Sequence, residues 1–94
     1  MSGRMSDADI YTLSPTCSFE QEGEGVVVFD AGGGTYWRGN ATARRVLELT
    51  VHGCTRGDAV ERLEREYGHS PGMRDDVRDL LAVLVRARIA KRNA

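Results

Sequence analysis

The fold is decided by residues 26–40, which have the sequence VVVFDAGGGTYWRGN. The first four of these residues are β-branched or aromatic, so they favour a strand. A second short strand, rich in aromatic residues, is predicted from Thr35 to Arg38. The segment between them, residues 30–34, has more glycine than a two-residue turn requires, which predicts a longer loop or a bulge. Together these residues predict a β-hairpin, the clearest strand pair in the chain.

Three consecutive glycines, Gly32–Gly34, are also found in loops that bind phosphate. Such loops connect a strand to a helix and place a Lys and a Ser or Thr against phosphate and metal. Here a second strand follows the glycines, and the sequence GK[ST] is absent. The sequence therefore predicts neither a nucleotide site nor any other cofactor site.

Upstream of the hairpin, residues 10–19 form an extended segment around Pro15. Proline lacks a backbone donor and is confined to edge strands, so we expect this segment to lie beside the hairpin as a third, weaker strand. Residues 1–9 show no apolar periodicity and are expected to be a disordered arm. Residues 91–94 are expected to be a C-terminal tail, which leaves one domain over residues 10–90.

Downstream of the hairpin, the apolar spacing predicts helices with clear start and stop signals. Asn40 is expected to cap a first helix that ends near Gly53. Thr55, with Asp58 three residues later, is expected to form a capping box for a second helix that ends at Gly68.

A third helix is predicted to start at Ser70, with Pro71 in its first turn. Its apolar residues map to one broad face, flanked on opposite sides by Val83 and Val85. This is more apolar surface than one core stripe requires. The residues of the broad face are Met73, Val77, Leu80, Leu81, Leu84 and Ile89.

The order of elements predicts an α+β domain, in which a three-stranded antiparallel sheet is followed by three helices packed on one side of it. The 94 residues suffice for one domain. There is no run approaching the roughly 18 apolar residues of a membrane span, and the N-terminus lacks the pattern of a signal peptide. We therefore expect a cytoplasmic protein without a membrane partner, in which Cys17 and Cys54 are free thiols.

Catalytic residues are sparse in this sequence. His52 and His69 both fall in predicted helix-terminal loops, where solvent exposure is the usual state. Cys54 follows His52 by two residues, but thiol–imidazole pairs are usually assembled from distant parts of a fold. No metal-ligand spacing is present. The sequence therefore predicts a binding module rather than an enzyme.

Two binding modes remain open. A winged-helix DNA reader would present the arginines of the third helix, but the net charge is −1 and three aspartates share that helix. The other mode is β-augmentation, in which an extended peptide adds a strand along residues 35–38. The arginines are Arg74, Arg78, Arg86 and Arg88, and the aspartates are Asp75, Asp76 and Asp79.

The ordered set of motifs resembles the PqqD-like domains, also called RiPP recognition elements, which bind leaders of ribosomally made peptides. The resemblance covers residues 10–89. It rests on the strand ending in Asp30, the glycine-rich turn, the aromatic strand and the helix opened by Asn40-Ala41-Thr42-Ala43. The Thr55 cap, the Ala59-Val60-x-x-Leu63-x-x-x-Tyr67 stripe and Ser70-Pro71 continue it. Within the family, the chain is most similar to the stand-alone leader-binding proteins of lasso-peptide clusters, with partners of radical-SAM enzymes as the alternative.

The resemblance implies a winged helix-turn-helix-like fold and no catalytic activity. The leader would dock as an antiparallel strand on the third strand, in a groove beside the third helix, and a separate leader peptidase or modifying enzyme would process it. A monomer, or a weak dimer through the same strand edge, is expected. The implied binding residues are Thr35, Tyr36, Trp37 and Arg38 on the strand, and Arg74, Val77, Arg78, Leu81 and Val85 on the helix.

Three details stay open at the level of sequence. Val77 and Leu81 fit the core as well as the groove. Tyr36 and Trp37 must point to opposite faces of the sheet, in either order. The family usually has an aliphatic residue where this chain has Gly39, and many members have a Trp where it has Val46-Leu47.

Overall fold

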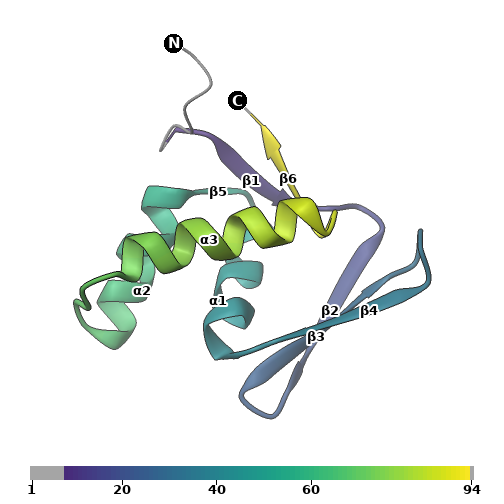
Figure 1. Cartoon of the computed structure of the whole chain (residues 1–94), viewed down its shortest axis with the longest axis horizontal. Helices are drawn as coiled ribbons and strands as arrows, with labels where there is room; N and C mark the ends of the chain where they lie inside the picture. Colours follow the sequence, from purple (N-terminus) through teal and green to yellow (C-terminus); the bar gives the residue numbers. More distant parts are fainter. Residues whose placement is uncertain (1–7, 94) are drawn as a thin grey trace.

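The computed structural model describes residues 8–93, and the arm expected at residues 1–9 lies mostly outside them. Three helices and two small antiparallel sheets form the described chain (Figure 1). None of the described helices is long and apolar enough to cross a membrane. The elements are β1 (Ile10–Leu13), β2 (Cys17–Glu22), β3 (Gly25–Asp30), β4 (Thr35–Gly39), α1 (Ala41–Thr50), β5 (Cys54–Thr55), α2 (Arg56–Tyr67), α3 (Met73–Arg86) and β6 (Ala90–Asn93).

The two sheets have different origins in the sequence. The hairpin sheet has the order β2-β3-β4, with β3 in the centre, and all three of its strands are consecutive. The terminal sheet has the order β5-β1-β6, so it brings the two ends of the described chain side by side (Figure 1). The α+β class is confirmed, with two three-stranded sheets in place of one.

The prediction of one extended segment over residues 10–19 was wrong. The chain turns at Ser14–Thr16, where the Cys17 amide donates to the Ser14 carbonyl at 3.0 Å. Only β2 pairs with the hairpin, while β1 pairs with β6 along residues 90–93. Residues 91–93 therefore form a strand, although the sequence analysis assigned them to a tail. The polar sequence AKRN carries no apolar alternation that would have indicated it.

The hairpin loop spans residues 31–34, longer than a two-residue turn, as predicted. Asp30 organises it: its Oδ1 accepts hydrogen bonds from the Gly32 amide and the Thr16 hydroxyl, both at 2.9 Å. The Gly34 amide donates to the Asp30 carbonyl at 2.7 Å. Since Thr16 precedes β2, the Asp30 carboxylate ties the loop to the neighbouring strand.

The first two helices begin as predicted. The Asn40 side chain accepts from the Ala43 amide at 2.9 Å, and Thr55 and Asp58 form the capping box. The predicted start of the third helix at Ser70 was wrong. Gly72 precedes the helix with φ of 88°, in the left-handed region, so the helical conformation cannot extend back through it to Pro71.

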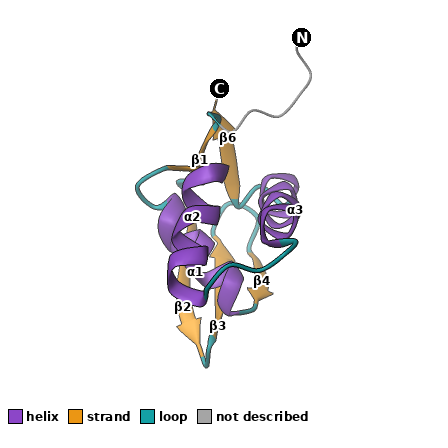
Figure 2. Cartoon of the chain, turned by 90° about the vertical axis from the view of Figure 1, so that its left-hand side faces the viewer, coloured by secondary structure: helices purple, strands orange, loops and turns teal. Residues whose placement is uncertain are grey.

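One hydrophobic core joins both sheets and the three helices. On β3, Val26 and Val28 are 1% exposed and face the helices, whereas Phe29 points to the opposite face of the sheet. Tyr11 is the fully buried residue of β1, and α1 contributes Ala43, Val46 and Leu47 to the core. Each such aliphatic side chain contributes about 1.5–3 kcal/mol by leaving water. Figure 2 shows the helices gathered on one side of the hairpin sheet.

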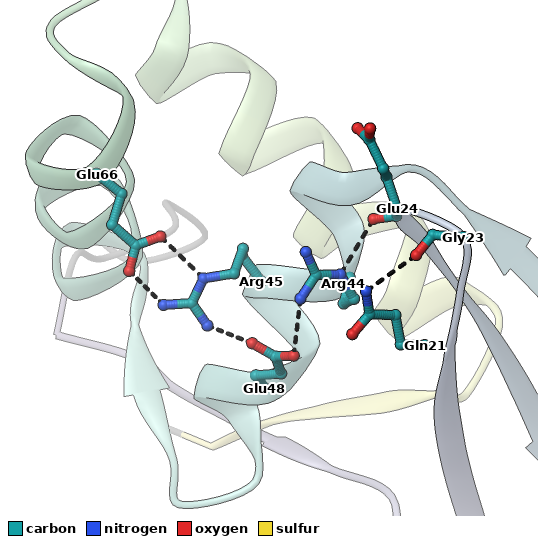
Figure 3. Close-up of polar contacts among 7 residues, drawn as sticks. All are labelled: Gln21, Gly23, Glu24, Arg44, Arg45, Glu48 and Glu66. Carbon is teal, nitrogen blue, oxygen red and sulfur yellow. Dashed lines mark hydrogen bonds and ion pairs between the residues drawn. The ribbon is translucent and has the colours of Figure 1, made fainter.

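A chain of charged contacts fastens the far end of the hairpin sheet to the helices (Figure 3). Arg44 on α1 donates to the Glu24 carbonyl in the β2–β3 turn at 3.0 Å and pairs with Glu48 at 3.2 Å. Arg45 contacts the same Glu48 and reaches Glu66 on α2, with Nε to Oε1 at 2.8 Å. The β2–β3 turn is therefore held to α1, and α1 is held to α2, by charged contacts beside the end of β4 at Gly39.

Candidate functional site

The outer edge of β4 is open. β4 pairs with β3 from Asp30↔Thr35 to Val26↔Gly39, and among the described residues no strand lies on its other side. An unpaired edge presents a row of backbone N–H and C=O groups that can pair with another chain. The sequence predicts an open edge at the same residues, 35–38.

The structure settles which aromatic residue of β4 faces inward. Trp37 lies opposite the buried Val28 and packs against the core. Tyr36 lies opposite Phe29 on the outer face, where it is 71% exposed and its ring centroid is 4.9 Å from that of Phe29. Trp37 is therefore part of the scaffold, and Tyr36 is available for contact.

Gly39 is required by the position of the Trp37 ring. A Cβ at residue 39 would lie 2.7 Å from the Trp37 ring and 2.7 Å from the Ala43 Cβ. The indole thus fills the space that an aliphatic side chain would take at the junction of β4 and α1. This accounts for the glycine at that position.

A hollow of about 210 Å³ lies beside β4. Its volume is below the roughly 300 Å³ of ordinary small-molecule pockets, so it suits a peptide side chain better than a cofactor. Asp30 is the one charged residue at its border. The lining residues are Val28, Asp30, Thr35, Tyr36, Trp37, Ala87 and Ile89.

The helical wall of this hollow differs from the one implied by the resemblance. Val77 and Leu81 are fully buried, so they belong to the core. At 3.6 residues per turn, Val85 projects from roughly the opposite side of α3 to Ala87, and it borders a second hollow. The residues at the β4 hollow are Ala87 and Ile89, which follow α3 directly.

The charged residues of the implied site lie apart from the β4 hollow. Arg78 pairs with Asp75 at 3.3 Å and Asp79 at 3.2 Å. Arg74 shares its side of α3 by helical spacing. Arg38 is exposed on the outer face of β4 and pairs with Glu22 of β2. The structure thus brings Thr35, Tyr36 and Trp37 together at the hollow and places the arginines of the helix elsewhere, and a role for any of them in leader binding stays a prediction.

Helical spacing shows a second apolar flank on α3, the one that includes Ala87. Leu80, Val83 and Ala87 recur at i, i+3 and i+7, and Val83 is 41% exposed, which is high for a valine. The sequence shows a broad apolar face on α3, but not which flank turns toward β4. That choice depends on how α3 packs on α2 and β6.

His52 and Cys54 border one hollow between α1 and α2. Burial raises the pKa of Cys54 to about 11, so its thiol stays protonated at neutral pH and is a poor nucleophile. Burial also raises the pKa of Cys17, and both cysteines are free, as predicted. Within residues 8–93, no cluster of His, Cys, Asp and Glu has the geometry of a metal site.

Comparisons with known proteins converge on one group. The family model for coenzyme PQQ synthesis protein D (PqqD) matches residues 25–90. A structure described as TbiB1 in complex with the TbiA(beta) leader peptide superposes with a TM-score of 0.75 at 23% identity, over 85% of this chain and 94% of that one. A lasso peptide synthetase B1 complexed with the leader peptide superposes with a TM-score of 0.73 at 27% identity, over 86% and 96%. No curated protein sequence matches this chain significantly.

Proposed function

This chain belongs to the PqqD family, and on that premise we propose that it binds the leader region of a ribosomally made precursor peptide, of the lasso class, as a strand added to β4. The observation that carries the proposal is the open edge of β4 beside a hollow lined by Ala87 and Ile89. Two proteins that share this fold were solved in complex with leader peptides, which supports leader binding here.

The backbone of β4 would supply affinity that depends little on the leader's sequence. A strand paired with Thr35–Gly39 points alternate side chains toward α3 and toward the outer face. Those directed toward α3 meet the hollow at Trp37, Ala87 and Ile89, and apolar side chains fit there best. Because the core holds Trp37 in place before the leader arrives, little ordering cost falls on this part of the protein.

Charged groups around the edge would tune the rate of association more than the affinity. Arg38 lies on the outer face and is already paired with Glu22, so a leader carboxylate would compete with that contact. Asp30 borders the hollow near the start of β4. Arg74 and Arg78 lie on the other flank of α3 and would act only on leader residues beyond the docked strand.

In this proposal the protein catalyses no reaction and needs no cofactor. It holds the leader in the cytoplasm and presents the precursor to a separate leader peptidase or modifying enzyme. The binding domain begins at residue 10 and includes β6, which closes the terminal sheet. A monomer would keep the β4 edge available, and pairing of two β4 edges would compete with the leader.

The test is a titration of the pure protein with labelled precursor leader and, separately, with random duplex DNA. Saturable leader binding at micromolar protein, with DNA binding that is weak, is the expected result. Salt-sensitive DNA binding without leader binding would instead support a winged-helix DNA reader, the second candidate. Leaders N-methylated at successive positions sharpen the test, because only methyl groups directed at β4 should block a paired strand.

A further inference from the structure

The terminal sheet also has an open edge. β6 pairs with β1 from Ile10↔Asn93 to Leu13↔Ala90, and within the described chain no strand lies on its other side. Arg92 lies opposite the core residue Tyr11, so its side chain leaves the sheet on the face that packs against α3. β6 follows the C-terminal end of α3 and contacts the helix (Figure 1).

A hollow of about 410 Å³ lies between α3 and β6. Its apolar lining residues are Ala82 and Val85, and its charged lining residues are Arg86 and Arg92. It is separate from the hollow beside β4, because Ala87 lines that one and projects from roughly the opposite side of α3 to Val85.

Positive charge is concentrated in the segment that follows α3 and forms β6, and two of its residues, Arg86 and Arg92, line this hollow. Between residues 86 and 92 there are four basic side chains and no acidic one, although the net charge of the whole chain is −1. All four are exposed, and of the described acids Asp9 pairs with one of them, Arg92, at 3.7 Å. The basic side chains are Arg86, Arg88, Lys91 and Arg92.

Arg88 occupies a backbone position that glycine would fill with less strain. Its φ is 65°, the one positive φ among the described non-glycine residues. The turn is held by hydrogen bonds from the Arg88 amide to the Val85 carbonyl at 3.0 Å and from the Ile89 amide to the Leu84 carbonyl at 2.9 Å. Glycine is the usual residue at this place after a helix, and strain retained in a structure is often associated with function.

We propose that the surface formed by Ala82, Val85, Arg86, Arg88 and Arg92, together with the open edge of β6, binds an extended acidic segment of a partner protein. Carboxylates of the segment would meet the arginines, and an apolar side chain between them would enter the hollow. The inference does not rest on leader binding, because it concerns the other flank of α3. With both edges occupied, α3 would separate two bound polypeptides.

The observations favour a protein segment over nucleic acid. Asp75, Asp76 and Asp79 lie on the same helix, and would repel the continuous phosphate backbone of a duplex. The apolar lining residues Ala82 and Val85 offer nothing to a phosphate, whereas they suit an aliphatic side chain. A short segment with alternating acidic and apolar residues matches both features.

The direct test uses a fluorescein-labelled, end-blocked eight-residue peptide of alternating Glu and Val, titrated against the full chain. Saturable binding that weakens as salt is added is expected. Arg86→Glu should reduce the affinity at least about tenfold. The matched control is Arg65→Glu on α2, an exposed arginine that forms an ion pair with Glu61, and it should leave the affinity unchanged.

Two further variants separate the contributions. Ala82→Phe fills the hollow without altering its charge and should also weaken binding of the peptide. Arg88→Gly should weaken the peptide while raising Tm by a few degrees, because it relieves the positive φ. If Arg88 had a purely structural role, Arg88→Gly would instead lower Tm and leave peptide binding unchanged.

Amide shifts in the labelled protein then locate the peptide. Shifts on β6 and the last turn of α3, with none on β4, are expected. Shifts on β4, equal losses in Arg86→Glu and Arg65→Glu, tighter binding of random duplex DNA, or no saturation at millimolar peptide would each overturn the proposal. Leader affinity measured on the same variants should stay unchanged, so failure here is distinguishable from failure of the leader proposal.

Discussion

The hairpin sheet has two outer strands, β2 and β4, and each pairs on one side with β3. β2 carries Glu20 and Glu22, both exposed, and acidic side chains of this kind discourage pairing with another chain. β4 borders a hollow that Ala87 and Ile89 also line, and the Trp37 side chain of β4 packs against the core. Both edges of the sheet therefore have backbone N–H and C=O groups that pair with no further strand of the described chain. The side chains beside the two edges differ.

This difference shows that an open edge alone does not define a peptide site. The edge must also border a surface that accepts side chains, and here the end of α3 supplies it. The β2 edge is distinguished by charge, and the β2–β3 turn is held by Arg44 to the helices. β4 is positioned instead by the packing of Trp37 over Gly39.

The largest effect is expected from a proline on β4. Tyr36→Pro should lower leader affinity at least about tenfold, because proline cannot donate a backbone hydrogen bond and distorts the edge. The matched variant is Gln21→Pro on β2. Tyr36 opposes Phe29 and Gln21 opposes Val26, so ladder alternation gives both amides the same orientation relative to β3.

Calorimetric titration of both variants, with Tm as a check on folding, measures the outcome. Equal loss of leader binding in the two proline variants would remove the distinction between the two edges.

The next largest effect is expected at Gly39, where the packing of Trp37 positions β4. Gly39→Val should destabilise the protein by about 1–3 kcal/mol, because the added atoms would collide with Trp37 and Ala43. Gly57→Ala on α2 is the control, since its Cβ meets nothing closer than 3.8 Å, and it should stabilise by about 0.5–1 kcal/mol. Urea unfolding measures both. A stable Gly39→Val protein would mean that Trp37 is not held as described.

Filling the hollow tests whether the surface beside β4 matters. Ala87→Phe should reduce leader affinity about tenfold, roughly 1.4 kcal/mol, by occupying the space for a leader side chain. Ala82→Phe makes the same substitution on the other flank of α3 and should leave leader affinity unchanged. Fluorescence anisotropy with labelled leader compares the two. A reversed order would assign the leader to the α3–β6 hollow.

The smallest effect is expected at the ion pair between Arg45 on α1 and Glu66 on α2. The hydrogen bond from Arg45 lowers the pKa of Glu66. The pair therefore stabilises the fold above the unfolded carboxylate pKa of about 4.3, and this stability is lost as pH falls through the lower folded pKa. Glu66→Gln should cost about 1 kcal/mol at pH 7 and reduce the loss of stability in acid.

Glu61→Gln, which breaks the exposed pair with Arg65, should cost only a few tenths of a kcal/mol. Identical acid unfolding curves for the wild type and Glu66→Gln would contradict the role given to Arg45.

Local signals predicted much of this fold and part of the site. The hairpin, the Asn40 cap and the Thr55–Asp58 capping box follow from residue types at short spacing, and the structure confirms them. The predictions that the structure contradicts concern segments whose conformation depends on long-range contacts. β6 forms because β1 passes beside it, and nothing in AKRN indicates a strand.

The site shows the same limit. Thr35, Tyr36 and Trp37 share the border of the β4 hollow, because they follow one another on a strand, which is a local property. The resemblance implies a wall on the flank of Val85, whereas the residues of the α3 end that border this hollow are Ala87 and Ile89. Only the orientation of α3 about its own axis decides between these flanks, and that orientation is set by packing across the whole core.

Amide hydrogen exchange of β4 and β2, with and without saturating leader, tests the central claim most directly. If the leader adds a strand to β4, exchange of the outward amides within Thr35–Gly39 slows markedly, while the outward amides of Cys17–Glu22 are unaffected. Unchanged exchange on β4 despite bound leader, or equal protection of both strands, would contradict this account.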